Sequence, residues 1–313
     1  MTVDQAERSS PTGEQWTVRR GGDELVVVEV GGGIRTWTRS GTDVLAGYPV
    51  TSTSVAGRGQ QLIPWPNRLR DGRYTYDGVE RQLYLSEPAK GNASHGLVRW
   101  AEWDLLDQTT SSITVGHRLH PQPGWAWVLE LTTLYALADD GLTVTTTAQN
   151  VGAGEAPYGY GMHPYLSIEG TPVEEVTLTV PAGRWLEVDP ERLLPVGTRD
   201  VAGSPYDFRA GRPIGDLALD TAFTDLDRGP DGRWEVRLDG LQGVADGAVT
   251  LWADEAYPWV QVFTGRAHPQ TEGTTGIAVE PMTCPPDAYN SGHDLVALRP
   301  DQVHTGSWGI RPS

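Results

Sequence analysis

The sequence predicts an all-β protein built from antiparallel strands, and three observations support this. Short runs of β-branched and aromatic residues alternate with turn-forming clusters along the 313 residues, which include 38 Gly and 23 Pro. No window of about 12 residues repeats its apolar positions with the period of an amphipathic helix. The expected strands follow one another without intervening helices, which favours an antiparallel sandwich or barrel over a parallel sheet.

Individual strands can be located from the same signals. In residues 73–85, two β-type runs meet at Asp77-Gly78, a strong hairpin signal. Two longer runs in residues 128–148 meet at an Asp-Asp-Gly sequence, where a second Asp-Gly turn is expected. Further strands are expected over residues 25–30, 176–180, 234–238, 249–252 and 259–264. Helices should be short and few.

The chain is expected to form one domain. It contains no low-complexity linker and no internal repeat of about 20 to 50 residues. Residues 1–15 are polar and are expected to form a frayed tail, and residues 16–313 a single β-sandwich domain. The polar start lacks the features of a signal peptide, and no apolar run approaches the roughly 18 residues of a membrane span. A cytoplasmic location is therefore expected.

Charge and cysteine content narrow the range of functions. Lys plus Arg number 24 and Asp plus Glu 41, which gives a net charge of −17. Nucleic acids and anionic membranes require a positive face, so neither is expected as a partner. The single cysteine, Cys284, excludes an intramolecular disulfide.

One candidate site segment lies in residues 62–69, where prolines surround Trp65 and precede Asn67 and Arg68. Prolines restrict the backbone, and a guanidinium presents a planar set of donors to substrate oxygens. Read alone, the segment is equally explained as a Pro-rich loop with a surface arginine.

Two histidines also lie beside glycine or proline residues. Gly96 allows close backbone approach beside His95, and His163 follows a glycine-rich stretch and precedes a proline. An imidazole can give or take a proton near neutral pH. Each histidine could instead be a structural residue that satisfies local hydrogen bonds.

Two carboxylates follow later in the chain. Glu280 ends an apolar, strand-like run, where burial would raise its pKa and make it a better base. Asp220 follows Leu219 and could be a turn residue or a ligand for substrate. A charged group at the end of a buried strand is costly unless it is paired or functional.

Taken in order, these segments resemble the aldose 1-epimerase (galactose mutarotase-like) family. The block from Glu280 to Gly292 is the most distinctive single match. The other matching pieces are Asn67-Arg68, His95-Gly96, His163-Pro164-Tyr165, Leu219-Asp220 and Gln261. The resemblance implies a large antiparallel β-supersandwich, few short helices and a sugar-binding groove on its concave face.

The resemblance also implies roles for the matching residues. Glu280 would be the general base for the anomeric hydroxyl, His163 the general acid for the ring oxygen, and His95 an assisting group. Arg68, Asn67, Asp220 and Gln261 would bind sugar hydroxyls. The candidates for an aromatic wall against the C–H groups of the sugar are Trp65, Trp125, Trp127 and Tyr165. The family needs no cofactor and no metal.

The leading hypothesis is therefore a mutarotase that interconverts the anomers of a free aldohexose such as glucose or galactose. The expected partner is a monosaccharide, and the protein is expected to be a monomer or homodimer. We expect the base and acid to stabilise each other's charged form.

Three alternatives stay open at this point. The first is a sugar-binding β-sandwich without catalysis, and the second is a glycoside hydrolase that uses Asp220 and Glu280. The third is an epimerase for a hexose phosphate or sulfonated hexose, which would need a second basic residue in the groove. Arg70, Arg73 and Arg99 are the candidates.

Overall fold

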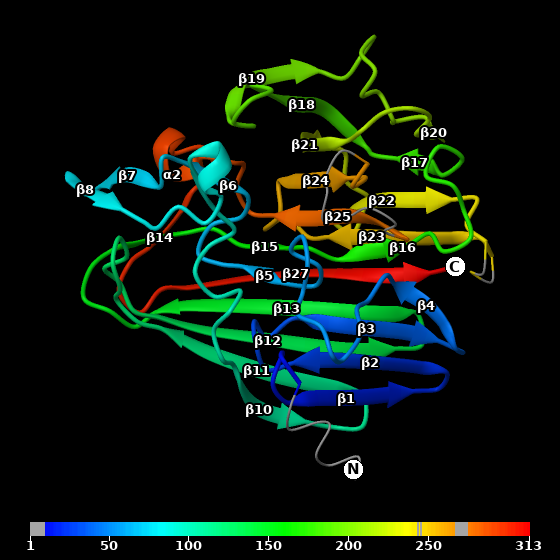
Figure 1. Cartoon of the computed structure of the whole chain (residues 1–313), viewed down its shortest axis with the longest axis horizontal. Coiled ribbons are helices and arrows are strands. Elements are labelled where there is room, and N and C mark those ends of the chain that lie inside the picture. Colours follow the sequence, from blue (N-terminus) through cyan, green and yellow to red (C-terminus); the bar gives the residue numbers. More distant parts are fainter. Residues whose placement is uncertain (1–9, 243, 245, 267–274) are drawn as a thin grey trace.

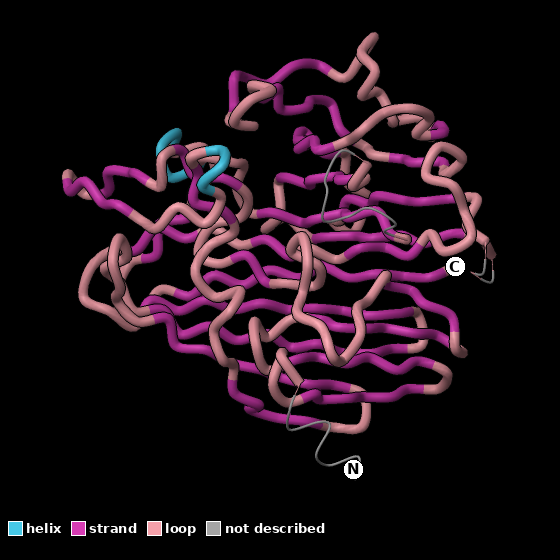
Figure 2. Tube along the Cα trace, in the orientation of Figure 1, coloured by secondary structure: helices cyan, strands magenta, loops and turns pink. Residues whose placement is uncertain are grey.

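The computed structural model describes residues 10–242, 244, 246–266 and 275–313, which fold into two large β-sheets (Figure 1). Their strands pair antiparallel throughout the described residues. Strands dominate the tube in Figure 2, and the helical segments among the described residues are short, namely η1 (Pro88–Lys90) and α2 (Ala288–Ser291). The prediction of a large antiparallel β-fold with few short helices is confirmed.

The first sheet carries four of the nine candidate site residues, namely Tyr165, Asp220, Gln261 and Glu280. Its order is β1 (Gln15–Arg20), β2 (Asp23–Val28), β3 (Ile34–Arg39), β4 (Thr42–Leu45), β16 (Tyr165–Ser167), β25 (Gly276–Met282), β24 (Trp259–Phe263), β21 (Asp220–Leu226), β18 (Ala182–Val188) and β19 (Pro195–Asp200). Two short strands, β15 (Gly161–Met162) and β5 (Gln61–Leu62), extend from β25.

The second sheet packs against the first and completes the sandwich. Its order is β10 (Asp104–Gln108), β11 (Ser112–Leu119), β12 (Leu129–Ala138), β13 (Gly141–Asn150), β27 (Val303–Pro312), β23 (Ala248–Ala253), β22 (Trp234–Asp239), β17 (Thr177–Thr179) and β20 (Arg212–Pro213). Three small ribbons flank the sheets: β6 (Arg68–Arg70) with β9 (Asn92–Ser94), β7 (Arg73–Tyr76) with β8 (Val79–Gln82), and β14 (Ala156–Tyr158) with β26 (Val296–Leu298).

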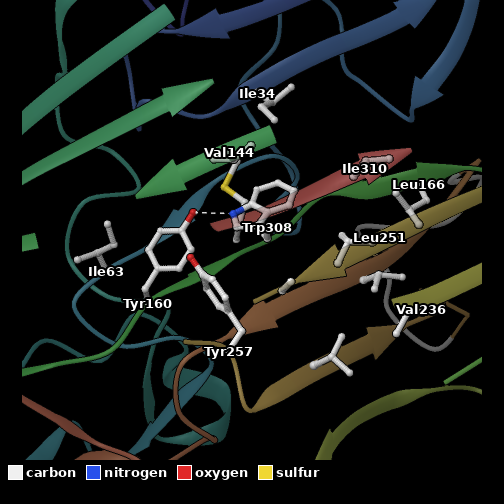
Figure 3. Close-up of a cluster of buried hydrophobic side chains, with 14 of the residues drawn as sticks. Ile34, Ile63, Val144, Tyr160, Leu166, Val236, Leu251, Tyr257, Trp308 and Ile310 are labelled. Atoms are coloured by element: carbon white, nitrogen blue, oxygen red, sulfur yellow. Dashed lines mark hydrogen bonds between the residues drawn. The ribbon is translucent and has the colours of Figure 1, made fainter. Parts of the chain in front are cut away.

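The two sheets share one hydrophobic core, in which side chains from both sheets are buried together. Figure 3 shows part of it, with Ile34 and Leu166 from the first sheet and Val144 and Ile310 from the second. The indole of Trp308 donates a hydrogen bond of 3.4 Å to the hydroxyl of Tyr160, which satisfies a buried polar group within this core (Figure 3).

The two hairpin predictions differ in outcome. The first is confirmed: β7 and β8 are joined by Asp77 and Gly78, whose φ angles of 51° and 70° suit a tight two-residue hairpin turn. The second hairpin exists, but Ala138 pairs with Gly141, so the turn residues are Asp139 and Asp140. The glycine is the first residue of β13, where its φ angle of +144° and its close approach to the Ile310 carbonyl leave no room for a side chain.

The predicted N-terminal tail, residues 1–15, lies partly outside the described residues. From Ser10 onward the chain is held in place: the Ser10 hydroxyl donates to the Val50 carbonyl at 3.0 Å, and β1 begins at Gln15. Residues 10–15 therefore contact the folded domain, and the rest of the predicted tail, residues 1–9, lies outside the described residues. Within the described part of the chain, no helix is long and apolar enough to cross a membrane.

Candidate active site

A cavity of about 700 Å³ opens over the first sheet. Its walls are the loop of residues 53–60, the ribbon of β6 and β9, and the facing ends of β21, β24 and β25. Its lining is rich in polar groups, namely Thr53, Ser54, Gln60, Asn67, Arg68, Ser86, Glu87, Ser94, His95, Arg99, His163, Asp220 and Glu280.

The register of the first sheet explains why the catalytic candidates meet. Glu280 in β25 pairs directly with Gln261 in β24, which in turn pairs with Ala222 in β21. Because side chains alternate between the faces of a strand, Asp220 shares the face of Ala222. Tyr165 pairs with Ala278, two residues before Glu280, and so lies on that face as well. Segments that are distant in sequence thus place their polar side chains on one face.

His163 and Glu280 form the centre of the site. The imidazole Nε2 lies 3.3 Å from Glu280 Oε1, and both side chains are almost completely buried, with exposed fractions of 6% and 3%. Burial, reinforced by Asp220 and opposed by Arg68, raises the pKa of Glu280 well above its ordinary value. Burial and the nearby Arg99 lower the pKa of His163 to about 3.

These shifts correct the expectation that the two groups stabilise each other's charge. Desolvation disfavours the charged form of each group and is the largest cause of both shifts. A carboxylic acid beside a neutral imidazole still holds one transferable proton, as does a carboxylate beside an imidazolium. In either arrangement, the pair therefore holds the one transferable proton that an acid–base couple needs.

The ring of His163 is fixed from several sides. Tyr165 stacks on it with 5.0 Å between ring centroids and 9° between planes, and the Tyr165 hydroxyl donates to the Ala56 carbonyl at 3.0 Å. Gly57 approaches so closely that a Cβ there would lie 2.6 Å from His163 Cδ2. The backbone N–H of His163 donates to the Gln60 carbonyl at 3.2 Å. These contacts together fix the orientation of the imidazole.

His95 is held by the ribbon of β6 and β9. The ring Nδ1 accepts the backbone N–H of Asn67 at 3.2 Å, and the backbone N–H of His95 donates to the Asn67 carbonyl at 2.8 Å. Both residues have positive φ angles, 62° for His95 and 54° for Asn67. Burial, Arg99 and His163 keep the pKa of His95 well below its ordinary value. Since Nδ1 is an acceptor, the proton of the neutral ring is on Nε2, which can donate a hydrogen bond.

Asp220 and Arg68 form the second polar centre. Asp220 Oδ1 accepts a hydrogen bond of 2.5 Å from Gln261 Nε2, and Asp220 Oδ2 lies 3.6 Å from Arg68 Nη1. Two other nitrogens of Arg68 bind Glu87, at 2.9 Å from Nε and 3.2 Å from Nη2. A charged pair with donors and acceptors facing a cavity can bind the hydroxyls of a polar ligand.

The structure brings most of the predicted site residues together at the cavity. Six of them line it: Asn67, Arg68, His95, His163, Asp220 and Glu280. Gln261 and Tyr165 do not line it but contact residues that do, Asp220 and His163 respectively. The expected aromatic wall is therefore not formed by Tyr165.

The prediction that Trp65 forms part of the aromatic wall is wrong. Its side chain is 3% exposed and packs edge-on against Tyr289, with 5.6 Å between ring centroids, in the hydrophobic core. The prolines around it direct the chain toward Asn67 and Arg68, and the indole itself anchors that loop. The tryptophan that does line the cavity is Trp100, which is 55% exposed.

Several cavity residues were not predicted, and no local motif marks them. Glu87 and Gln60 are single polar residues in ordinary turn sequences, and residues 53–57 are a short loop of small side chains. Of the three candidate basic residues, Arg99 lines the cavity, whereas Arg70 pairs with Asp287 and Arg73 with Gln82. Among the described residues, no cluster of three His, Cys, Asp or Glu side chains could hold a metal ion.

Comparison with known proteins places this geometry in a family. The family model described as aldose 1-epimerase matches residues 14–311. The *Escherichia coli* protein YihR, described as uncharacterized, is 33% identical over 294 residues, which cover 94% of this chain and 91% of YihR. A GalM/aldose epimerase homologue from *C. elegans* superposes with a TM-score of 0.82 at 18% identity, over 96% of this chain and 99% of the homologue. A galactose 1-epimerase from *Lactobacillus acidophilus* gives 0.76 at 20% identity, over 95% and 93% of the two chains. The chain therefore belongs to the aldose 1-epimerase family.

Proposed function

We propose that this protein is a mutarotase that interconverts the α and β anomers of a free aldohexose such as glucose or galactose. The observation that carries the proposal is the contact of 3.3 Å between His163 and Glu280 inside a polar cavity. Opening a hemiacetal needs one group to take a proton and another to give one, and this pair can do both.

The proposed reaction runs through the ionised arrangement of the coupled pair, in which the shared proton lies on His163 and Glu280 is a carboxylate, although burial favours the neutral arrangement. The Glu280 carboxylate takes the proton from the anomeric hydroxyl O1 while the C1–O5 bond breaks and the electrons of the O1–H bond form the aldehyde. His163 gives its proton to O5, so the open-chain sugar carries a hydroxyl there. Rotation about C1–C2 presents the other face of the aldehyde. Ring closure returns the proton on O5 to His163 and the proton on Glu280 to O1, and no covalent intermediate forms.

The surrounding groups have proposed roles that follow from their geometry. His95 donates from Nε2 toward a sugar oxygen, because its Nδ1 already accepts the Asn67 N–H. Arg68 and Asp220 supply a donor and an acceptor for sugar hydroxyls, and Gln261 holds the Asp220 carboxylate. The raised pKa of Glu280 makes it a stronger base than an exposed carboxylate, which favours removal of a hydroxyl proton.

A second candidate substrate is a hexose with a phosphate or sulfonate group, and Arg99 favours it. Arg99 lines the cavity beside Ser86 and Ser94. Across the described residues, no carboxylate lies within 4.0 Å of its guanidinium, in contrast to Arg68 with its two acidic partners. A guanidinium without an acidic partner in a polar cavity suits an anionic substituent.

Exchange NMR of anomeric protons at equilibrium tests both candidates. Wild-type protein would be added in catalytic amounts to glucose, galactose, glucose 6-phosphate and a sulfonated hexose. We expect accelerated exchange for at least one sugar, and no acceleration with any of them by folded protein would contradict the proposal.

The same samples identify the substrate class. If the substrate is anionic, Arg99→Met should lose activity on the charged sugar selectively, by about 10-fold or more for a lost charge-assisted contact. Arg73→Met is the matched control, because Arg73 binds Gln82 in a hairpin and does not line the cavity. Equal activity of Arg99→Met and Arg73→Met on the charged sugar would argue against an anion-binding role for Arg99.

A further inference from the structure

Glu87 is a cavity residue whose carboxylate faces Arg68. The contact is bidentate, with Arg68 Nε at 2.9 Å from Oε2 and Nη2 at 3.2 Å from Oε1. Both side chains are largely buried, with exposed fractions of 15% for Arg68 and 23% for Glu87. Paired donors on paired acceptors fix the plane and direction of a guanidinium as well as its position.

The backbone around Glu87 is rigid, which makes this contact precise. The Glu87 N–H donates to the Asn92 carbonyl at 2.9 Å, and the Glu87 carbonyl accepts the N–H groups of Lys90 and Asn92. Asn92 begins β9, and β9 pairs with β6 so that Ser94 lies opposite Arg68. A short closed turn therefore returns the carboxylate to the strand that carries its arginine.

The other charges near Arg68 explain what this contact prevents. Asp220 Oδ2 lies 3.6 Å from Nη1, and Glu280 also contributes to the electrostatic field at the guanidinium. Without Glu87, these two carboxylates would be the remaining acidic partners near the arginine, and the long side chain would be drawn toward them. Arg68 would then occupy space and acceptors that the substrate needs.

We propose that Glu87 is a positioning residue that keeps the Arg68 guanidinium from closing further on Asp220 and from turning toward Glu280, so that Nη1, which lies 3.6 Å from Asp220 Oδ2 and 3.5 Å from Asn67 Oδ1, can donate to a substrate hydroxyl. This inference rests on the proposed function, because it assumes that the cavity binds a sugar. Glu87 acts through Arg68 and not on the reacting atoms. Its loss should therefore weaken sugar binding more than it slows the chemical step.

The test is Glu87→Gln, which keeps the shape and one acceptor but removes the charge. Glu187→Gln is the matched control, because Glu187 also pairs with an arginine, Arg199 at 2.7 Å, but does not line the cavity. With the best sugar from the exchange experiment, we expect Glu87→Gln to raise KM about 10-fold with kcat nearly unchanged, as for loss of binding common to substrate and transition state. A purely structural role would reduce the amount of active protein, and so lower kcat without raising KM.

A double-mutant cycle shows whether the effect passes through Arg68. In an Arg68→Met background, Glu87→Gln should cause no further increase in KM, because the residue that it positions is absent. An unchanged KM in Glu87→Gln, a fall in kcat alone, or the same rise in KM in both backgrounds would each overturn the inference. Thermal unfolding of each variant verifies that all of them are folded.

A binding measurement separates this inference from the proposed function. The dissociation constants of glucose and galactose can be obtained for the same variants by NMR titration, without any turnover. If wild type binds a sugar but does not exchange its anomers, the mutarotase proposal fails, while a weaker affinity of Glu87→Gln that requires Arg68 still supports the positioning role. If wild type binds neither sugar and exchanges no anomer, both proposals fail.

Discussion

Replacing Gly57 with alanine tests the fixed orientation of His163 directly. A Cβ at this position would lie 2.6 Å from His163 Cδ2 and 3.1 Å from Nε2. Carbon atoms in contact are normally about 3.5 to 4.0 Å apart, so the imidazole or the loop must move by about 1 Å. The stacked ring of Tyr165 limits the movement of the imidazole on its own side.

The expected loss of activity follows from that displacement. A misplacement of about 1 Å in a catalytic group can cost about 10²-fold in rate, so Gly57→Ala should reduce anomer exchange by about this factor. The φ angle of Gly57 is +76°, which adds a backbone cost of roughly 1–2 kcal/mol to the free energy of folding. The variant should therefore be both less active and moderately less stable.

Gly203→Ala is the control that separates these effects. Its φ angle is +74°, almost equal to that of Gly57, and a Cβ there would meet nothing within 4 Å. We expect a similar decrease in thermal stability with unchanged activity. Exchange NMR and thermal unfolding would be measured on both variants. Equal exchange rates for Gly57→Ala and Gly203→Ala would refute the argument that Gly57 maintains the position of His163.

Two further predictions concern the proposed base. Glu280→Gln keeps the shape of the side chain but cannot take a proton, so anomer exchange should fall by about 10²- to 10⁴-fold while sugar binding persists; nearly full activity would rule out Glu280 as the base. The raised pKa of Glu280 also means that the ionised base is lost as pH falls through that raised value, so kcat/KM should decrease on the acid side. Among the charged and titratable neighbours of Glu280, Asp220 raises this pKa, Arg68 lowers it and His163 contacts the carboxylate, so Asp220→Asn should move the acid limb to lower pH. A pH profile that is identical in wild type and Asp220→Asn would contradict this electrostatic coupling.

The sequence predicted the fold class well because its signals are local. The turn at Asp77-Gly78 and the alternating runs of residues depend on neighbouring residues alone. The order of strands could not be obtained in the same way, because β16 lies between β4 and β25 through contacts between distant segments. The second hairpin shows that even a local turn prediction can be displaced by one residue. Gly141 pairs with Ala138 as part of the strand, where it packs closely on Ile310.

The site residues that lie in several short matching segments, which occur in a fixed order, could be predicted from the sequence. The cavity residues that belong to no such segment were missed. Glu87 and Gly57 are ordinary residues in turns, and their importance arises only because the fold places them against Arg68 and His163. The prediction that Trp65 packs against the sugar was wrong. In sequence, an aromatic residue near a site suggests a surface for sugar binding, but the same indole can equally fill the core. The catalytic roles of Glu280, His163 and His95 and the binding roles of Asn67, Arg68 and Asp220 remain predictions.

The adjacent strands β16, β25, β24 and β21 have a consequence for how the candidate site forms during folding. The site spans these strands, and the ribbon that carries Arg68 and His95 comes from a much earlier part of the chain. Such non-local pairings form late, since the entropy of closing long loops must be overcome before the contacts contribute. A short hairpin such as β7–β8 can form from local contacts, whereas the cavity exists only when the first sheet is fully assembled. If the proposed activity is correct, it depends on the finished sheet, and turnover would test native folding more strictly than the content of β-strands does.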